Sequence, residues 1–179
     1  MKIRAAVLGL LVVSAIVVCM TADGWAQEKK KFSFKAPPGL GKYTQNHVID
    51  VRDVPGHQIR IFELRTTYSD VAPEFDGVKV KEAWAHGFSD YINGSGSAMT
   101  YGVSLMENGD KIYSRTAIQS HTVTATDGSK QLTFRTVQTL TGGTGRFSGI
   151  RGVLLGGGTS DLKTAVIDAG TQGEYWIEK

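Results

Sequence analysis

The chain has 179 residues, of which 41% are hydrophobic, a single cysteine, and a formal charge of +3 at pH 7. This length and apolar content suffice for one globular domain with its own core. The charge is too close to neutral for a dedicated nucleic-acid binder, and one cysteine excludes an internal disulfide framework and a thiolate metal cluster.

The first 26 residues have the order of a secretory signal peptide. Two basic residues precede an apolar run over 5–18, and small residues follow near Ala26. The run is shorter than the roughly 20 residues of a membrane-spanning helix. The alternative to a cleaved signal peptide is a retained N-terminal anchor. Cleavage after Ala26 would remove Cys19 and release a secreted or periplasmic protein without stable membrane insertion.

Residues 27–46 contain four closely spaced lysines and the turn-forming segment "APPGLG". A charge cluster beside a Pro-Pro-Gly turn is typical of a solvated segment. The sequence therefore predicts a basic, flexible tail over 27–46, with a specific anion or membrane site as the alternative, and places the folded domain over 47–179.

The rest of the chain is punctuated by the turn segments "YINGSG", "MENGDK" and "ATDGSK". Asn-Gly and Asp-Gly between alternating segments are typical of tight β-hairpins, and no stretch after residue 46 has a helical period with caps. The turn residues Asn93, Asn108 and Asp127 are 15 and 19 residues apart, which indicates long antiparallel strands. Strands are predicted over 57–67, 78–92, 96–107, 111–126, 130–141, 150–156 and 171–178, with an optional eighth in the 160–168 region.

The predicted fold is all-β, an antiparallel seven- or eight-stranded closed β-barrel. Closure would pair every strand edge and so prevent edge-to-edge association. A barrel of this size has a lumen that side chains or one small ligand can fill. An open β-sandwich is the structural alternative.

Alternation along the strands predicts which side chains enter the lumen, because apolar positions identify the inner face. In the segment 78–92, Trp84 and Phe88 share their parity with Glu82 and His86. A buried carboxylate without a partner is costly, so such groups in a pocket often mark functional sites. The predicted candidate catalytic residues are Glu63 and Glu82, and the predicted ligand-binding residues are Arg65, Trp84, His86, Phe88, Tyr101, Phe134 and Gln138. The alternative is that Glu63–Arg65 and Glu82–His86 are structural pairs at the barrel rim.

The glycine-dense stretch "TLTGGTGRFSGIRGVLLGGG" over 139–158 does not predict a nucleotide site. It lacks the GxxxxGK[ST] and GxGxxG patterns, and no helix follows it to receive a phosphate. The nucleophile elbow GxSxG is absent, and the four histidines show no metal-ligand spacing. The sequence therefore predicts neither a cofactor nor a metal site.

The segment "TGGTGRFSGIRG" over 141–152 resembles the GGTGxFxGxxG segment of the allene oxide cyclase and dirigent β-barrel families. The resemblance covers roughly 57–178 and implies a tight turn, with Phe147 in the core and Gly149 and Gly152 in close backbone packing. "IRIFELRT" is similar to the first-strand segment of allene oxide cyclases, which implies that Glu63 is the cavity glutamate; Arg65 replaces an asparagine of that family. The resemblance also implies a homo-oligomer, a trimer.

Three functions follow as hypotheses. The favoured one is a secreted or periplasmic barrel that binds a small apolar or aromatic molecule in its lumen. The first alternative is an isomerase or cyclase that steers a reactive intermediate, with Glu63 or Glu82 orienting it or stabilising charge. The second is a structural envelope barrel filled by its own side chains. Binding is favoured because a fold does not fix an activity, and whether the protein is an enzyme is left open.

Overall fold

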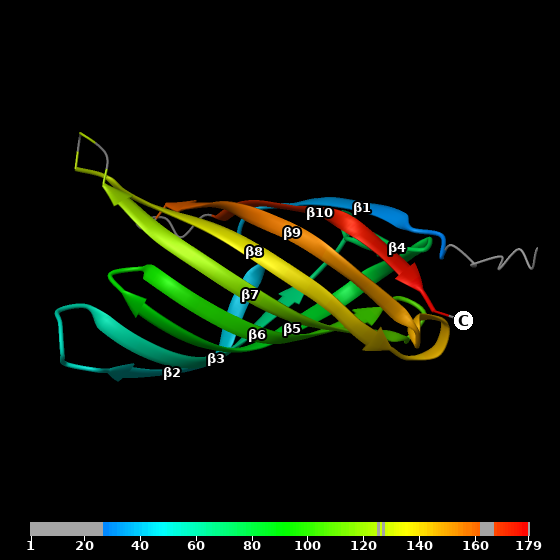
Figure 1. Ribbon diagram of the computed structural model, residues 1–179, viewed down its shortest axis with the longest axis horizontal. Coiled ribbons are helices and arrows are strands. Elements are labelled where there is room, and N and C mark those ends of the chain that lie inside the picture. Colours follow the sequence, from blue (N-terminus) through cyan, green and yellow to red (C-terminus); the bar gives the residue numbers. More distant parts are fainter. Residues whose placement is uncertain (1–26, 125, 127, 162–166, 179) are drawn as a thin grey trace, which may run out of the picture.

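The structure is a computed structural model that describes residues 27–124, 126, 128–161 and 167–178 (Figure 1). The predicted signal peptide over 1–26 and the predicted turn residue Asp127 lie outside the described residues. Within the described ranges, no helix is long and apolar enough to cross a membrane.

The described residues form ten strands and one short 3-10 turn, and every paired strand is antiparallel. The elements are β1 (Lys30–Ala36), β2 (Gly41–Asp50), β3 (His57–Thr67), β4 (Glu74–Phe75), β5 (Val78–Ile92), β6 (Ser95–Met106), β7 (Lys111–Thr124), β8 (Lys130–Gly143), η1 (Gly145–Phe147), β9 (Ile150–Asp161) and β10 (Ile167–Ile177). The all-β, antiparallel prediction is confirmed. In the region 160–168, where an eighth strand was predicted, residues 160–161 end β9 and residues 167–168 begin β10, and residues 162–166 lie outside the described residues.

Two strands lie where the sequence predicted a flexible tail. β1 and the first part of β2 fall within 27–46. Phe32 and Phe34 of β1 alternate with polar neighbours, and Phe32 is buried in the core. The lysines around them were interpreted as a solvated cluster, but on a strand their alternation with phenylalanine is typical of a sheet with one buried face.

The sheet is not closed by hydrogen bonds, which corrects the predicted closed barrel of seven or eight strands. Its strand order is β1-β10-β9-β8-β7-β6-β5-β3-β2, with β4 pairing β5 beside this path. The two edge strands are consecutive in sequence and are joined by residues 37–40. Pro37 and Pro38 in this connection have no N–H group, so it cannot extend the hydrogen-bond ladder. Figure 1 shows the rolled sheet with β1 at the top and β2 at the bottom of the view.

A β-bulge at Lys81 changes which side chains of β5 face inward. Val80 pairs with Met106 and Glu82 pairs with Leu105, so Lys81 is the additional residue on β5. Beyond the bulge the inner positions are small: Ala83, Ala85, Gly87 and Ser89. Ser89 is 1% exposed and its neighbour Phe88 is 48% exposed. The prediction that Trp84, His86 and Phe88 face the lumen is therefore wrong for this strand.

The apolar core fills one end of the rolled sheet. Its buried members are Phe32, Phe75, Val80, Met106, Ile112, Leu140, Phe147, Ile150, Leu154 and Tyr175. Phe147 is fully buried, which confirms the core position that the "TGGTGRFSGIRG" segment implied. A Cβ on Gly149 would lie 2.3 Å from the carbonyl oxygen of Glu178, and a Cβ on Gly152 would lie 2.5 Å from that of Glu174 in β10. This close approach of the backbones requires glycine at both positions.

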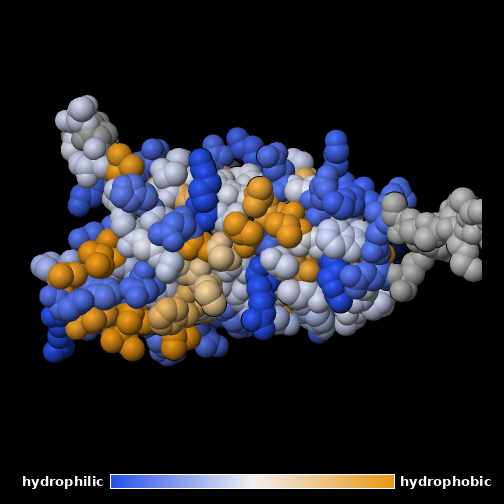
Figure 2. All heavy atoms as spheres, in the orientation of Figure 1, coloured by the Kyte–Doolittle hydropathy of each residue, from blue (hydrophilic) through white to orange (hydrophobic). Residues whose placement is uncertain are grey.

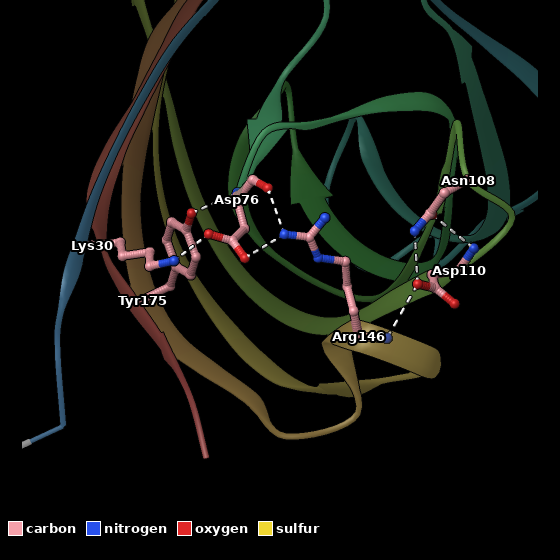
Figure 3. A network of polar contacts seen from close by, with 6 residues as sticks. All are labelled: Lys30, Asp76, Asn108, Asp110, Arg146 and Tyr175. Carbon is pink, nitrogen blue, oxygen red and sulfur yellow. Dashed lines mark hydrogen bonds and ion pairs between the residues drawn. The ribbon is translucent and has the colours of Figure 1, made fainter. Parts of the chain in front are cut away.

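At the end of the sheet that holds the apolar core, polar and charged groups from several strands contact Asp76, which follows β4 (Figure 3). Its carboxylate accepts hydrogen bonds from Lys30 of β1 and from Arg146 of η1, the latter at 2.8 Å. Its backbone N–H donates to the hydroxyl of Tyr175 at 2.8 Å. The backbone N–H of Arg146 in turn donates to Asp110 at 3.2 Å. The β4–β5 turn is thus joined to three other parts of the chain, and we call this end the plugged end.

Candidate functional site

Two adjoining cavities lie on the inner face of the sheet, next to the core. Their volumes are about 150 and 110 Å³. Four residues line both cavities: Ala83, Ser104, Ser114 and Gln138. These residues come from the four consecutive strands β5 to β8, whose register brings them together. The interior therefore contains two small cavities beside the apolar core.

The larger cavity, which we call the aromatic chamber, is surrounded by aromatic rings. Phe32 stacks on Phe75 with centroids 4.6 Å apart, and Phe34 meets Tyr68 edge to face at 6.0 Å. All four rings line the chamber. Burial raises the pKa of the Tyr68 hydroxyl, which therefore stays protonated at neutral pH and is able to donate a hydrogen bond.

The smaller cavity, which we call the hydroxyl chamber, is lined half by apolar residues and glycine and half by threonine, serine and Gln138. Thr66, Thr100 and Thr116 contribute to it, in addition to the serines shared with the aromatic chamber. Between the chambers, Nε2 of Gln138 donates to Oγ of Ser114 at 3.0 Å. The amide oxygen of Gln138 and the hydroxyl of Ser104 add further polar groups to the same wall.

Polar groups continue along the inner face beyond the chambers. Oγ of Ser89, Oγ of Ser120 and Nε of Arg60 are buried and have no hydrogen-bond partner among the described residues. Arg60 and Ser89 are directly opposite each other on β3 and β5. Because buried polar groups are normally hydrogen-bonded, these atoms give the interior a hydrogen-bonding capacity that the protein itself does not use.

A separate groove of about 810 Å³ crosses the outer face from β2 to β8. Four predicted site residues line it: Glu63, His86, Phe88 and Tyr101. Oε2 of Glu63 lies 2.9 Å from Nε2 of His86, and Thr44 donates to the other carboxylate oxygen. The hydrogen bond from Thr44, followed by that from His86, lowers the pKa of Glu63. Glu63 is therefore a stable carboxylate at neutral pH, with both oxygens engaged.

The ion pairs of β3 and β5 differ from those considered from the sequence. The predicted alternatives were Glu63–Arg65 and Glu82–His86, each within one strand. In the structure Glu63 pairs with His86 and Arg65 pairs with Glu82, both across strands. The antiparallel register places Glu63 directly opposite His86. Arg65 also lies over the ring of Trp84, with its guanidinium carbon 5.9 Å from the ring centroid.

Of the nine predicted site residues, the structure places only Phe134 and Gln138 on the inner face. Gln138 lines both chambers, whereas Phe134 lies further along β8. Strand parity puts the other seven on the outer face, where Glu82 is nevertheless buried beneath Arg65. Of these seven, Trp84 is also among the residues that line the hydroxyl chamber.

The chamber residues that sequence reasoning missed are mostly small. Ala83, Ser104 and Ser114 carry little hydropathy, and Tyr68 follows β3 outside the predicted strand. One signal was available: small residues recur at every second position over 83–89, opposite in parity to large ones. In a narrow rolled sheet this period-two pattern of size indicates the inner face.

The described residues contain no group of three or more histidine, cysteine, aspartate or glutamate side chains arranged to hold a metal ion.

Comparison with known proteins gave a similarity to solved structures. No protein-family model matches the chain, and no curated protein matches it. Among solved structures it is similar to the pterocarpan synthase dirigent protein PsPTS1, with 15% identity and a TM-score of 0.39. The similarity covers 85% of this chain and 96% of the other. No family assignment follows from a similarity of this size.

Proposed function

We propose that the protein binds a small aromatic molecule with a hydrogen-bonding substituent inside the rolled sheet. The observation that carries this proposal is the contact between the aromatic chamber and the hydroxyl chamber, with Gln138 and Ser114 between them. The aromatic chamber, at about 150 Å³, is large enough for a single benzene ring. The adjoining chamber supplies hydroxyl groups for a substituent on that ring.

The chemistry of the two walls assigns a role to each. The rings of Phe32, Phe34, Tyr68 and Phe75 offer faces and edges to an aromatic guest, and aromatic pairs of this kind contribute about 0.5–1.5 kcal/mol beyond apolar burial. Gln138 both donates and accepts, so it would bind a hydroxyl or carbonyl substituent. A guest without a polar group would leave the hydroxyl chamber unsatisfied.

The outer groove is less suited to a small ligand despite its volume. Small-molecule sites usually bury about 70–90% of the ligand surface. The groove lies on an open sheet face, and its side chains Ile61, Phe88 and Met99 are all exposed. A small molecule there would remain largely in solvent.

An isomerase or cyclase in which Glu63 or Glu82 is catalytic would need these carboxylates beside the bound molecule. Both lie on the outer face, engaged by His86 and Arg65 respectively, and neither lines a chamber. The proposal therefore assigns them no chemical role. It retains export through the predicted signal peptide, so the ligand would be met outside the cytoplasm.

The test is calorimetric titration of the purified protein with phenol and with benzyl alcohol. We expect saturable binding, weakened about tenfold by Gln138→Leu because one buried hydrogen bond is lost. Gln131→Leu, at an exposed position of the same strand, is the matched control and should bind as the wild type does. Ala83→Leu should abolish binding by filling the chambers.

Circular dichroism and thermal melting would first establish that each variant is folded. Unchanged affinity in both Gln138→Leu and Ala83→Leu would overturn the proposal, as would the absence of binding to folded wild-type protein.

A further inference from the structure

An apolar row crosses the outer face of six neighbouring strands. Its members lie directly opposite one another in the register of the sheet: Ile61, Phe88, Met99, Ala117, Val137 and Leu155. All six are exposed, Met99 by 67%. Figure 2 shows hydrophobic side chains gathered on this side of the molecule, with hydrophilic ones between them. Contiguous exposed apolar surface on this scale usually marks an interaction site.

Polar rows flank the apolar row over the four central strands, β5 to β8. On one side the cross-strand register aligns Asp90, Ser97, Gln119 and Arg135. On the other side it aligns His86, Tyr101, Arg115 and Thr139. Together with Phe88, Met99, Ala117 and Val137, these residues form a patch of three rows and four columns, which we call the outer patch.

We propose that the outer patch is an interface with a second copy of this chain. The two copies would be related by a two-fold axis that lies above the outer face, parallel to the strands and over the gap between β6 and β7. Such an axis lays β5 of one copy over β8 of the other, and β6 over β7. An isologous interface must be complementary to itself under this rotation. Each row can therefore be checked for complementarity from the register alone.

The first row brings opposite charges together. Asp90 on β5 and Arg135 on β8 occupy equivalent positions on either side of the axis, so each Asp90 faces Arg135 of the second copy. Asp90 already contacts His57 through Oδ1, 2.8 Å from Nε2, which leaves Oδ2 for the arginine. Arg135 has no carboxylate partner among the described residues and donates to the backbone oxygen of Phe134.

The middle row matches large side chains with smaller ones. Phe88 faces Val137 of the second copy, and Met99 faces Ala117. Met99 is 67% exposed and has a long, flexible side chain, and the small side chain of Ala117 opposite it leaves room for the methionine to insert. Complementary packing of this kind at an interface approaches the density of a protein interior.

The third row places a cation over an aromatic ring. Tyr101 on β6 faces Arg115 on β7 of the second copy, and this pairing occurs twice. Arg115 is exposed and takes part in no recorded hydrogen bond or ion pair among the described residues. Arginine over tyrosine is a favourable cation–π arrangement, and both residue types are enriched at interfaces.

Self-complementarity favours a second copy over an unrelated partner. A different protein would have to supply the matching charges, ring and small side chain independently, whereas the two-fold axis supplies all of them from one sequence. The sequence resemblance implied a trimer; the two-fold arrangement predicts a dimer, and the two differ in mass.

The test is analytical ultracentrifugation of the purified protein over a concentration series. We expect a dimer whose dissociation constant rises at least tenfold in Arg135→Asp, because each Asp90 then faces a carboxylate. Asp90→Arg should weaken the dimer similarly. The double variant Asp90→Arg/Arg135→Asp should recover the wild-type constant to within about threefold, because the pair is restored with its signs exchanged.

Glu107→Arg, in the exposed β6–β7 turn, makes the same charge change as Asp90→Arg outside the patch and should leave the dimer unchanged. Met99→Glu should give a monomer. A monomeric wild type, an oligomer indifferent to Met99→Glu, or a double variant no tighter than the single ones would each overturn the proposal. Phenol titration of the Met99→Glu monomer separates this result from the ligand proposal, which concerns the opposite face.

Discussion

The two faces of the same sheet differ in a way that hydropathy alone does not anticipate. On β5, Ser89 faces inward and is 1% exposed, while the adjacent Phe88 faces outward and is 48% exposed. The inner face beyond the core consists largely of alanine, glycine, serine and threonine, and the outer face holds isoleucine, phenylalanine, methionine and tyrosine. In a tightly rolled sheet, side-chain volume limits what can face inward. Large apolar residues on the outer face then become available for a partner.

The largest expected effect compares one phenylalanine from each side. Phe147→Ala should lower the free energy of unfolding by about 3–5 kcal/mol, because a fully buried ring is lost from the plugged end. Phe88→Ala, on the exposed face, should cost less than about 1 kcal/mol at protein concentrations too low for association. Urea unfolding monitored by circular dichroism measures both. Similar losses from the two substitutions would show that the assignment of faces is wrong.

A smaller effect concerns the charges at the plugged end. The hydrogen bond from Lys30, followed by that from Arg146, lowers the pKa of Asp76. A depressed carboxyl pKa stabilises the fold at all pH values above the unfolded pKa of about 4, and this stabilisation is lost as the pH falls through the folded value. Asp76→Asn should remove about 2 kcal/mol at pH 7. Its unfolding free energy should also fall less than that of the wild type between pH 5 and pH 2.5, and parallel curves would contradict the assignment.

The smallest expected effect on stability comes from His57, at the start of β3. Nδ1 of His57 is 2.6 Å from Asp53 and Nε2 is 2.8 Å from Asp90. These two carboxylates, Asp53 first, raise the pKa of His57. The stabilisation is complete below the unfolded pKa of about 6.5 and disappears as the pH rises through the higher folded value. Melting temperatures at pH 6 and pH 9 should therefore differ more for the wild type than for His57→Gln. An equal difference in the two proteins would exclude this role.

The strand content followed from the sequence because turns are local. "YINGSG" and "MENGDK" placed the ends of β5 and β6 within one residue, and β3 and β5 have their predicted bounds. The missed strands, β1 and β2, carry lysines and a Pro-Pro turn whose local signals favour a loop. Only their pairing with β10 and β3, distant in sequence, makes them strands.

The candidate site was harder to predict because it depends on which side chains point inward and on the register between neighbouring strands. One bulge residue, Lys81, reversed the parity of most of β5, and a bulge leaves little trace in a single sequence. The pairs Glu63–His86 and Arg65–Glu82 require knowing which residues lie opposite across two strands. Gln138 was identified because its strand has no bulge between it and the apolar positions that set the parity.

The central claim is that the inner face binds a small aromatic molecule while the outer face is reserved for a partner. Amide chemical-shift mapping with added phenol tests it most directly. We predict saturable shifts at Ser104, Ser114 and Gln138, with the signals of Phe88, Met99 and Ala117 unmoved. Shifts confined to the outer residues, with the chamber residues unaffected, would contradict the claim.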